Sequence, residues 1–405
     1  MRILQFAPRI CWPLDTGAKL RNYHLARGLS EHVPVTLLAF TDHQQAIGDL
    51  AKIYQQVIVI PRDRGYTTAK ILQGGLGRTP LPVLNYTTDL MKRELASLLS
   101  ENDFDVVQIE SVHLVNYLPT IREVRPSSLV VCDWHNIESE LMQRYAERES
   151  NFFRRAYARR TARLMSECEK RALQDFDAHI VVSERDAERL HSSNSNARIF
   201  VIENGVDANA YVSAEPPAGE PATKRIIFVG SMDYHANIDA ATSFAREVWP
   251  SLRARQPETI FTIVGKDPAP QVRELTSMPG VEVTGTVDSV RPYYREALAA
   301  VVPLKVGGGS RLKILEAMAA GVPVVSTTLG AEGLDVSDDE NILIADTNEQ
   351  LIEAILSVIE NTELRERLVA SGRALVSSRY DWSLLGNKLF ETYQRVAGKA
   401  EPPQQ

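Results

Sequence analysis

Cysteine is scarce in this sequence: Cys11, Cys132 and Cys168 are widely separated along 405 residues. They form neither a disulfide framework nor the close spacing of a metal site, which is typical of a protein from a reducing cytoplasm. The chain also lacks an apolar run of the roughly 20 residues that a membrane-spanning helix needs. Pro8 and Arg9 interrupt its first apolar stretch too early for the core of a secretion signal. These features predict a soluble, cytoplasmic protein.

An excess of positive charge is missing as well, since 45 Lys and Arg stand against 52 Asp and Glu and give a net charge of −7. This balance argues against general nucleic-acid binding, which needs a basic surface. The dinucleotide-binding pattern G-x-G-x-x-G is absent, which counts against such a cofactor. The hydrophobic content of 44% is that of an ordinary globular protein. The length predicts two or three domains.

Buried-strand patterns alternate with helical patterns on both sides of a tract rich in Pro, Ala and Glu, 213–223. Such alternation predicts an α/β protein with two Rossmann-like domains, and ligands usually bind in the cleft between domains of this kind. The last helical pattern is a candidate to cross back to the first domain. The predicted divisions are an N-terminal domain at 1–205, a linker at 206–224, a C-terminal domain at 225–380, a helix at 381–398 and a frayed tail at 399–405.

The most informative segment is Val306–Pro323, VGGGSRLKILEAMAAGVP. It follows an apolar run that has the pattern of a buried strand, and its glycines form a loop that can approach a ligand closely. Ser310 is a good N-cap for the helix that follows, and Gly321 and Pro323 end that helix. The segment therefore predicts a strand, a glycine loop and a helix N-terminus.

Arg311 and Lys313 lie in the first turn of this predicted helix, where cations oppose the helix dipole. A bound phosphate would compensate them, because free backbone N–H groups and the dipole make a helix N-terminus an anion site. The alternative is that both side chains point into water, as most surface Arg and Lys do. The motif by itself favours phosphate binding only slightly.

Polar residues follow two predicted strands, 105–109 and 128–132, where open α/β sheets place their chemistry. They are Glu110–His113, ESVH, and Asp133–Glu138, DWHNIE. His135 lies within the second group, beside acidic and amide side chains that can tune its pKa, which makes it a candidate catalytic residue. Most histidines are structural, so the alternative that His135 has only a structural role stays open.

The pattern from 138 to 175 predicts one long helical stretch, either straight or bent. Its segment 152–163, FFRRAYARRTAR, mixes aromatic side chains with arginines, as in helices that lie on an anionic membrane surface. The favoured alternative is a domain surface on which the arginines are solvated or paired with nearby glutamates: Glu147, Glu149, Glu167 and Glu169.

Five segments together resemble the retaining glycosyltransferases of family 4 over nearly the whole chain. Gly309–Ser326, GSRLKILEAMAAGVPVVS, resembles the most specific motif of that family, and Ile202–Asp207, IENGVD, its signature before the interdomain linker. Phe228–Gly230, Ile263–Gly265 and Val283–Val287 resemble the other landmarks of its C-terminal domain. The resemblance implies a GT-B fold and a nucleotide-sugar donor.

The same resemblance implies roles for single residues. Glu316 would bind the ribose hydroxyls, and a carboxylate can indeed accept two hydroxyl hydrogen bonds. Gly17 would face the leaving phosphate, Thr286 and Val287 would meet the base, and His135 would lie near the reacting sugar. The complete donor set is Gly17, Gly230, Gly265, Thr286, Val287, Gly308, Gly309, Ser310, Arg311, Lys313 and Glu316. The acceptor side is assigned to Glu110, Asn136 and Glu138.

Two departures from the family pattern stand out. Gly308 replaces the first of the two motif glutamates, and the Arg and Lys that usually follow the first C-terminal strand are missing from Ser231–Ile238. The hypothesis is that Arg311 and Lys313 supply the missing positive charge. This combination resembles a subgroup found with bacterial exopolysaccharide and envelope genes.

The implied activity is metal-independent, retaining transfer from a UDP- or GDP-sugar to a glycan, a lipid-linked or a small-molecule acceptor. His135, Arg311 and Lys313 would be catalytic, the two cations by stabilising the departing phosphates. Two D-x-D sequences, Asp103–Asp105 and Asp175–Asp177, match a metal motif formally, but turn roles are favoured and no metal or other cofactor is assigned. A location at the inner face of the membrane is also considered. The alternatives are a GT-B epimerase, a sugar-phosphate synthase or a silent nucleotide-binding scaffold.

Overall fold

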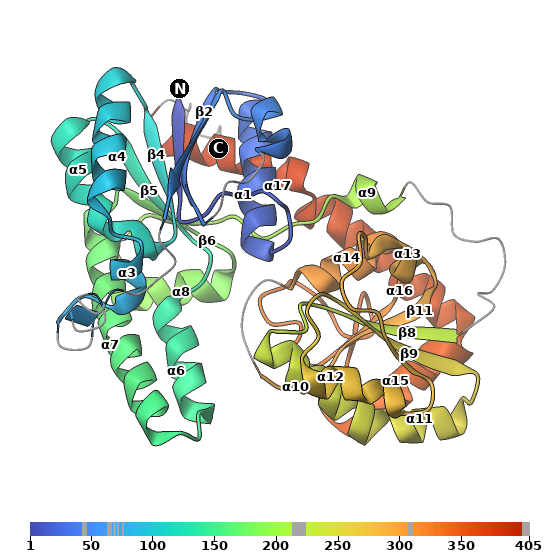
Figure 1. The fold of residues 1–405 in the computed structure, drawn as a ribbon. Helices are drawn as coiled ribbons and strands as arrows, with labels where there is room; N and C mark the ends of the chain where they lie inside the picture. Colours follow the sequence, from blue (N-terminus) through green and yellow to red (C-terminus); the bar gives the residue numbers. More distant parts are fainter. Residues whose placement is uncertain are drawn as a thin grey trace. The chain divides into compact units, whose positions relative to one another are not determined.

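The computed structural model describes residues 1–42, 47–62, 67, 70, 73–74, 77–212, 224–306 and 311–398. It divides into two compact units (Figure 1). The first contains Met1–Glu203 and the chain from Ser383, and the second contains Asn204–Trp382. The division therefore falls shortly before the predicted linker at 206–224. Residues 213–223 of that linker lie outside the described residues.

The first unit is built on a seven-stranded parallel sheet with the order β3-β2-β1-β4-β5-β6-β7. All five residues of β1 are buried, as expected where helices cover both faces of a parallel sheet. The strands are β1 Ile3–Ala7, β2 Val35–Thr41, β3 Gln56–Pro61, β4 Val106–Glu110, β5 Leu129–Trp134, β6 Ala178–Val181 and β7 Ile199–Val201. The α-helices are α1 Gly17–Ser30, α3 Leu81–Asn85, α4 Asp89–Glu101, α5 Leu118–Val124, α6 Glu138–Arg148, α7 Phe152–Asp175, α8 Glu184–Ser193 and α17 Trp382–Val396. Two 3₁₀ helices, η1 Gly48–Lys52 and η2 Val112–Tyr117, complete the unit's described helices.

The C-terminal helix α17 packs directly on α1. Gly28 and Gly386 meet without side chains between them, since a Cβ added to Gly28 would lie 2.6 Å from the Cα of Gly386. Beyond that crossing, Tyr393 reaches the core of the first unit and donates to Gln108 Oε1 at 2.5 Å. The helix therefore crosses back to the first domain, as the sequence predicted.

The second unit has a six-stranded parallel sheet with the order β10-β9-β8-β11-β12-β13. Its strands are β8 Lys224–Val229, β9 Thr259–Val264, β10 Val281–Val283, β11 Ala297–Val302, β12 Val324–Ser326 and β13 Leu343–Ile344. Its α-helices are α9 Ala208–Val212, α10 His235–Ser243, α11 Trp249–Arg255, α12 Pro270–Arg273, α13 Arg291–Arg295, α14 Leu312–Ala320, α15 Asn348–Glu360 and α16 Thr362–Leu375. The π-helical turns η3 Phe244–Val248 and η5 Val376–Tyr380 and the 3₁₀ turn η4 Glu274–Ser277 extend three of these helices. The predicted α/β class with two Rossmann-like domains is confirmed.

The expectation of one long helix from 138 to 175 is wrong, because α6 and α7 form a hairpin (Figure 1). The backbone turns extended at Glu149, and Asn151 then caps α7. Its side-chain oxygen accepts from the backbone N–H groups of Phe153 and Arg154 at 3.0 and 3.1 Å. This capping bond makes a new helix start more favourable than continuation.

The glycine-loop helix also begins later than predicted. Helix α14 starts at Leu312 with Arg311 as its N-cap, and the predicted cap, Ser310, lies outside the described residues. Gly321 ends the helix with φ +75°, a conformation that glycine adopts without strain. The side chains of Leu315 and Met318 are buried and give α14 an apolar face.

Candidate active site

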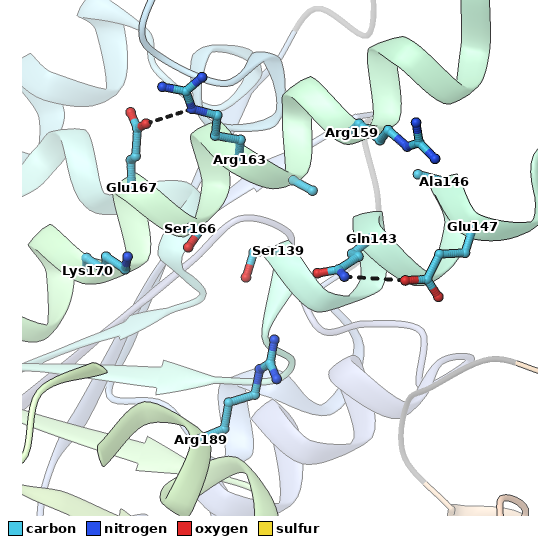
Figure 2. Close-up of a pocket in the computed structure, with 11 residues that line it drawn as sticks. Ser139, Gln143, Ala146, Glu147, Arg159, Arg163, Ser166, Glu167, Lys170 and Arg189 are labelled. Carbon is cyan, nitrogen blue, oxygen red and sulfur yellow. Dashed lines mark hydrogen bonds and ion pairs between the residues drawn. The ribbon is translucent and has the colours of Figure 1, made fainter. Parts of the chain in front are cut away.

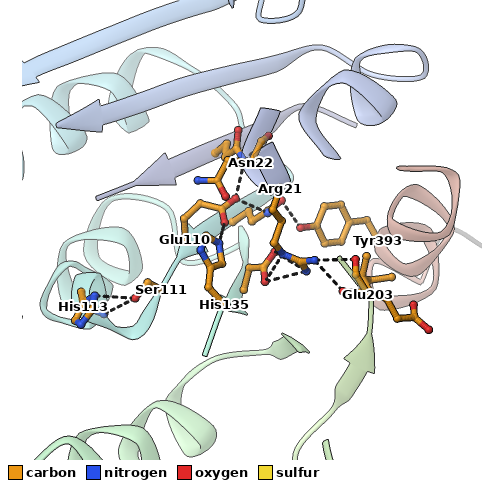
Figure 3. A network of polar contacts seen from close by, with 12 residues as sticks. Arg21, Asn22, Glu110, Ser111, His113, His135, Glu203 and Tyr393 are labelled. Carbon is orange, nitrogen blue, oxygen red and sulfur yellow. Dashed lines mark hydrogen bonds and ion pairs between the residues drawn. The ribbon is translucent and has the colours of Figure 1, made fainter. Parts of the chain in front are cut away.

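The carboxyl ends of β4 and β5 bring Glu110 and His135 together in the first unit (Figure 3). The two strands are paired so that Glu110 lies opposite Asp133, and His135 follows directly after β5. His135 Nε2 lies 2.8 Å from Glu110 Oε2. Its side chain keeps 13% of its surface exposed, whereas that of Glu110 keeps 1%. The pair therefore has its histidine toward solvent and its carboxylate in the core.

Glu110 is held in place by amide groups. Gln5 and Gln108 each donate to its Oε1 at 2.6 Å. These two amides are oriented in turn by hydroxyls, since Tyr54 donates to Gln5 Oε1 and Tyr393 to Gln108 Oε1, both at 2.5 Å. Glu110 is thus a preorganised partner for the histidine.

Asp133 pairs with a buried arginine that the sequence analysis did not single out. Nε of Arg21 lies 3.1 Å from Asp133 Oδ2, and its Nη2 lies 3.1 Å from both carboxylate oxygens. The same guanidinium donates to the carbonyl groups of Ile202 and Glu203 at 2.9 and 3.0 Å. Arg21 therefore links α1, the end of β5 and the segment after β7. No local pattern marks it, because its partner is 112 positions away.

Two opposing effects set the pKa of His135. Burial lowers it, but the hydrogen bond to Glu110 and the charges of Asp133 and Glu110 outweigh burial and raise the pKa above the ordinary 6.5. The ring consequently holds its proton more strongly than a free imidazole. A protonated imidazole can donate a hydrogen bond to a sugar hydroxyl or stabilise nearby negative charge.

Within the described residues, Glu110, Asp133 and His135 offer ligand atoms within 4.8 Å of one another. A divalent cation there would have to compete with the guanidinium of Arg21 and with the amide donors on Glu110. The donor set therefore suits an internal ion-pair network better than a metal. The D-x-D carboxylates also have other partners: Asp105 accepts from the backbone of Arg2, and Asp177 from that of Val130, each at 2.7 Å.

A second histidine, His113, lies close to the predicted acceptor residues. Its Nε2 is 3.8 Å from Glu138 Oε2, and its Nδ1 is 3.0 Å from Ser111 Oγ. Burial, together with the charges of His135 and Arg9, lowers the pKa of His113 to about 4. The histidine is therefore neutral at physiological pH. The sequence signal for it was its place just after β4.

Glu138 begins α6 and has an unusual acidity. Burial and the charge of Glu169 raise its pKa to about 7, against the opposing effect of His135. A carboxyl group with such a pKa can both donate and accept a proton near neutrality.

Asn136 lies partly buried in the bend between β5 and α6. The backbone of Ser111 adopts φ +91°, which is rare for a residue other than glycine and is found at functional sites.

In the second unit, Lys313 of α14 extends toward α10. Its Nζ donates to Asn237 Oδ1 at 2.6 Å and lies 4.5 Å from the centre of the Phe228 ring. Burial and the charge of Arg311 lower the pKa of Lys313 to about 7, although Glu316 acts in the opposite direction. In this structure the neighbouring groups therefore do not fully stabilise the charged form of Lys313.

Glu316 lies one turn further along α14. Burial raises its pKa to about 7, opposed by hydrogen bonds from Tyr294 and Tyr211 and by the charge of Lys313. The hydroxyl of Tyr294 donates to Glu316 Oε2 at 3.3 Å. Lys313 and Glu316 thus form a pair of opposite charges, and desolvation disfavours the charged form of each.

Arg311 is directed elsewhere. Its Nη2 donates to the carbonyl of Leu329 at 2.8 Å and lies 3.5 Å from Glu332 Oε2. Only 6% of the residue is exposed, so the alternative in which it points into water is wrong. The two predicted cations contact different elements, α10 and the loop after β12. Their joint action on a phosphate stays a prediction.

Glycines directly after β8 and β9 leave space for the side chain of Lys313. A Cβ on Gly230 would lie 2.7 Å from Asn237 Nδ2 and 3.1 Å from Lys313 Nζ. A Cβ on Gly265 would lie 1.6 Å from the carbonyl oxygen of Gly230. Both strand ends therefore require glycine for the contact between Lys313 and Asn237.

The structure locates the remaining predicted donor residues only in part. Gly17 is the first residue of α1. Thr286, which is exposed, and Val287, which is partly buried, lie in the loop between β10 and α13. Gly308, Gly309 and Ser310 lie outside the described residues.

Each of the two parts of the chain matches a known family model. Residues 16–210 match the family model described as Glycosyltransferase Family 4. Residues 223–361 match the model described as Glycosyl transferases group 1. Each part of the chain thus resembles a glycosyltransferase family model. This agrees with the resemblance seen in the sequence.

Curated relatives match over part of their length. Phosphatidyl-myo-inositol mannosyltransferase of Mycobacterium tuberculosis is 31% identical over 208 residues, which are 49% of this chain and 54% of that protein. Glycogen synthase of the same organism is 26% identical over 218 residues, 51% of each chain. The chain thus spans about half the length of the curated relatives it matches.

Solved structures match over almost the whole chain. HepE of Anabaena, in complex with UDP and glucose, has a TM-score of 0.68 at 16% identity and covers 96% of this chain and 98% of its own. Sucrose-phosphate synthase of Thermosynechococcus elongatus has a TM-score of 0.68 at 16% identity, with coverage of 99% and 100%. At such identities the likeness shows the fold alone. The fold of this chain is GT-B.

Proposed function

We propose that the protein is a retaining glycosyltransferase. It takes a sugar from a UDP- or GDP-sugar and transfers it to a glycan, a lipid-linked or a small-molecule acceptor in bacterial polysaccharide or envelope biosynthesis. The supporting observation is the arrangement of Lys313, which contacts Asn237 at the end of β8, and Glu316, which accepts from Tyr294. It offers a desolvated cation for phosphate and a carboxylate for ribose one helical turn apart.

Donor binding would relieve the strain on both charged groups. A phosphate beside Lys313 restores the charge that burial disfavours, and ribose hydroxyls that donate to Glu316 stabilise its ionised form. When the sugar–phosphate bond breaks, negative charge grows on the departing nucleotide. A fixed cation stabilises that charge most strongly in a water-poor site, and this needs no metal ion. Arg311 acts at the same stage in this proposal.

His135 has the role of orienting the donor sugar. Its bond to Glu110 fixes the ring through Nε2, so Nδ1 is the nitrogen available to a sugar hydroxyl. Glu110, Asn136 and Glu138 belong to the acceptor side of the same unit. The raised pKa of Glu138, about 7, suits a group that receives the proton of an acceptor hydroxyl.

A thermal-shift screen with UDP, GDP, ADP, TDP and their sugars tests donor binding. A ligand at about 100 times its dissociation constant stabilises the folded protein by roughly 2.7 kcal/mol. The shift for the true donor nucleotide should disappear in Lys313→Met and persist in Lys305→Met, whose lysine pairs with Glu247 on the surface. No shift with any nucleotide would favour a scaffold. Product analysis with and without acceptor separates transfer from epimerisation or sugar-phosphate synthesis.

Within the described residues, no helix combines the length and the apolarity needed to cross a bilayer. Membrane association in this proposal is peripheral and uses segment 152–163. Phe152 and Phe153 at the hairpin tip are 66% and 80% exposed. Exposed aromatic rings beside arginines favour the interface of an anionic membrane, at the inner face of the bilayer.

A further inference from the structure

A groove lies between α6 and α7 in the first unit, with α8 beside it (Figure 2). Its volume is about 620 Å³, within the usual range of roughly 300–1,000 Å³ for ligand sites. The side chains that matter for its chemistry are those of Ser139, Arg159, Arg163, Ser166, Lys170 and Arg189.

The groove carries an excess of positive charge in a chain whose net charge is −7. Four cationic side chains line it against two carboxylates, Glu147 and Glu167. Arg163 is paired with Glu167 and Arg189 with Glu140, each at 3.2 Å. Arg159 and Lys170 form no ion pair with any residue that the structure describes. Two cations are therefore left to face the groove.

One end of the groove adjoins the predicted acceptor side. Ser139 is the second residue of α6, next to Glu138, whose carboxyl group is 3.8 Å from His113. From Ser139 to Glu147 the lining follows α6 for about 12 Å, at 1.5 Å per residue. The other end leads toward the hairpin tip with Phe152 and Phe153. The groove thus runs from the candidate acceptor site to the candidate membrane contact.

We propose that this groove binds the phosphate group of the acceptor, a sugar carried on a phosphate or diphosphate. The proposal rests on the function proposed above and names its acceptor class. Arg159 and Lys170 bind the phosphate oxygens, and the hydroxyl of Ser166 adds a donor. The acceptor sugar then lies toward Glu138. The same chemistry serves a free sugar phosphate and a lipid-linked one.

Binding of two probes tests the groove on the full chain. The probes are inorganic pyrophosphate, measured by calorimetry, and phosphatidylcholine vesicles with or without phosphatidic acid, measured by sedimentation. The test variant is Arg159→Gln/Lys170→Gln. The matched control, Arg154→Gln/Arg171→Gln, removes the same charge from exposed positions of the same helix that do not line the groove.

We expect the test variant to bind at least one probe about tenfold more weakly, a change of roughly 1.4 kcal/mol, and the control to stay near wild type. Loss with pyrophosphate indicates a free phosphate acceptor, and loss only with phosphatidic acid vesicles indicates a lipid-linked one. Equal losses in both variants, or no binding of either probe, would overturn the proposal.

Pyrophosphate that binds at the donor site instead would respond to Lys313→Met and not to Arg159→Gln/Lys170→Gln, which would also count against the groove. The nucleotide thermal shift in the test variant keeps the two proposals apart. If nucleotides still bind while the groove fails, only the acceptor assignment falls. If nucleotides fail in the wild type while probe binding depends on the groove, the donor assignment falls.

Discussion

His135 Nε2 lies 2.8 Å from Glu110 Oε2. The two residues are 25 positions apart in the sequence and lie at the ends of adjacent strands. Glu110 in turn is fixed by two glutamine side chains from β1 and β4. The histidine is thus oriented by the sheet itself. A site built on strands holds its geometry more firmly than one built on loops alone.

Glu110→Gln should lower the pKa of His135. The substitution removes a hydrogen bond to a charged acceptor and a neighbouring negative charge, and burial, which lowers the pKa, then prevails. NMR titration of the histidine ring measures the change, with His191 on the surface as the internal control. An unchanged titration of His135 would show that Glu110 does not set its protonation.

Lys313→Met should change how stability depends on pH. The folded protein releases the Lys313 proton near pH 7, whereas an unfolded lysine keeps its proton to about 10.5. The cost of the buried charge is therefore full below pH 7 and decreases as the pH rises toward 10.5. The gain in stability of Lys313→Met over wild type should be largest below pH 7 and should decrease as the pH rises toward 10.5. Urea unfolding across this range measures it, and Lys305→Met should follow wild type.

Glu316→Ala should weaken nucleotide binding mainly through the ribose. A hydrogen bond to a charged group contributes about 1.5–3 kcal/mol, so affinity for the donor nucleoside diphosphate should fall by at least about tenfold. The 2′,3′-dideoxy analogue lacks the hydroxyls and should bind both proteins with similar affinity. Calorimetry with the two ligands gives the comparison. An equal loss for both ligands would place Glu316 elsewhere than at the ribose.

Gly265→Ala should lower the stability of the fold, whereas Gly230→Ala should impair nucleotide binding. The added methyl group at Gly265 meets a backbone oxygen, so this variant should lose stability by about 1–3 kcal/mol or more. The one at Gly230 meets the side chains of Asn237 and Lys313, which can move. That variant should stay folded and lose nucleotide binding. Urea unfolding and the nucleotide thermal shift together distinguish the two, and a well-bound nucleotide in Gly230→Ala would contradict the assignment.

Phe152→Ser/Phe153→Ser should reduce sedimentation with anionic vesicles without changing thermal stability. Both rings are largely exposed, so the fold loses little when they are removed. Tyr234→Ser, at an exposed aromatic position of the second unit, is the control. Equal vesicle binding by all three proteins would exclude the hairpin tip as the membrane contact.

The structure alters the interpretation of the arginine-rich segment. Arg160 donates to the carbonyl groups of Gly74 and Gly77 at 2.6 and 2.7 Å, so it binds backbone groups rather than facing solvent. Arg163 pairs with Glu167 as the charge pattern predicted. Glu149 accepts from Tyr145 instead, at 2.6 Å. One sequence stretch thus supplies backbone-binding, pairing and groove-lining arginines.

Much of the architecture could be predicted from the sequence alone. Buried strands in a parallel sheet are continuous apolar runs, as in β1, β8 and β9, so the alternation of strands and helices was visible in the local pattern. Gly321, at the end of α14, was equally local, because its positive φ depends on its own backbone. The positions of His135 and Glu138 after a strand followed from the same reading.

The partners of these residues were decided only by the tertiary structure. Arg21 and Asp133 are 112 positions apart, and Lys313 and Asn237 are 76 apart. Which strands become neighbours determines such pairs, and strand order is not written in local periodicity. The break at Asn151 is similar in kind, because a capping bond competes with helix continuation over a difference of only about 1 kcal/mol. The sequence by itself determined most of the elements and the chemical character of their ends, and the strand order and packing within each unit decided which of those groups lie together.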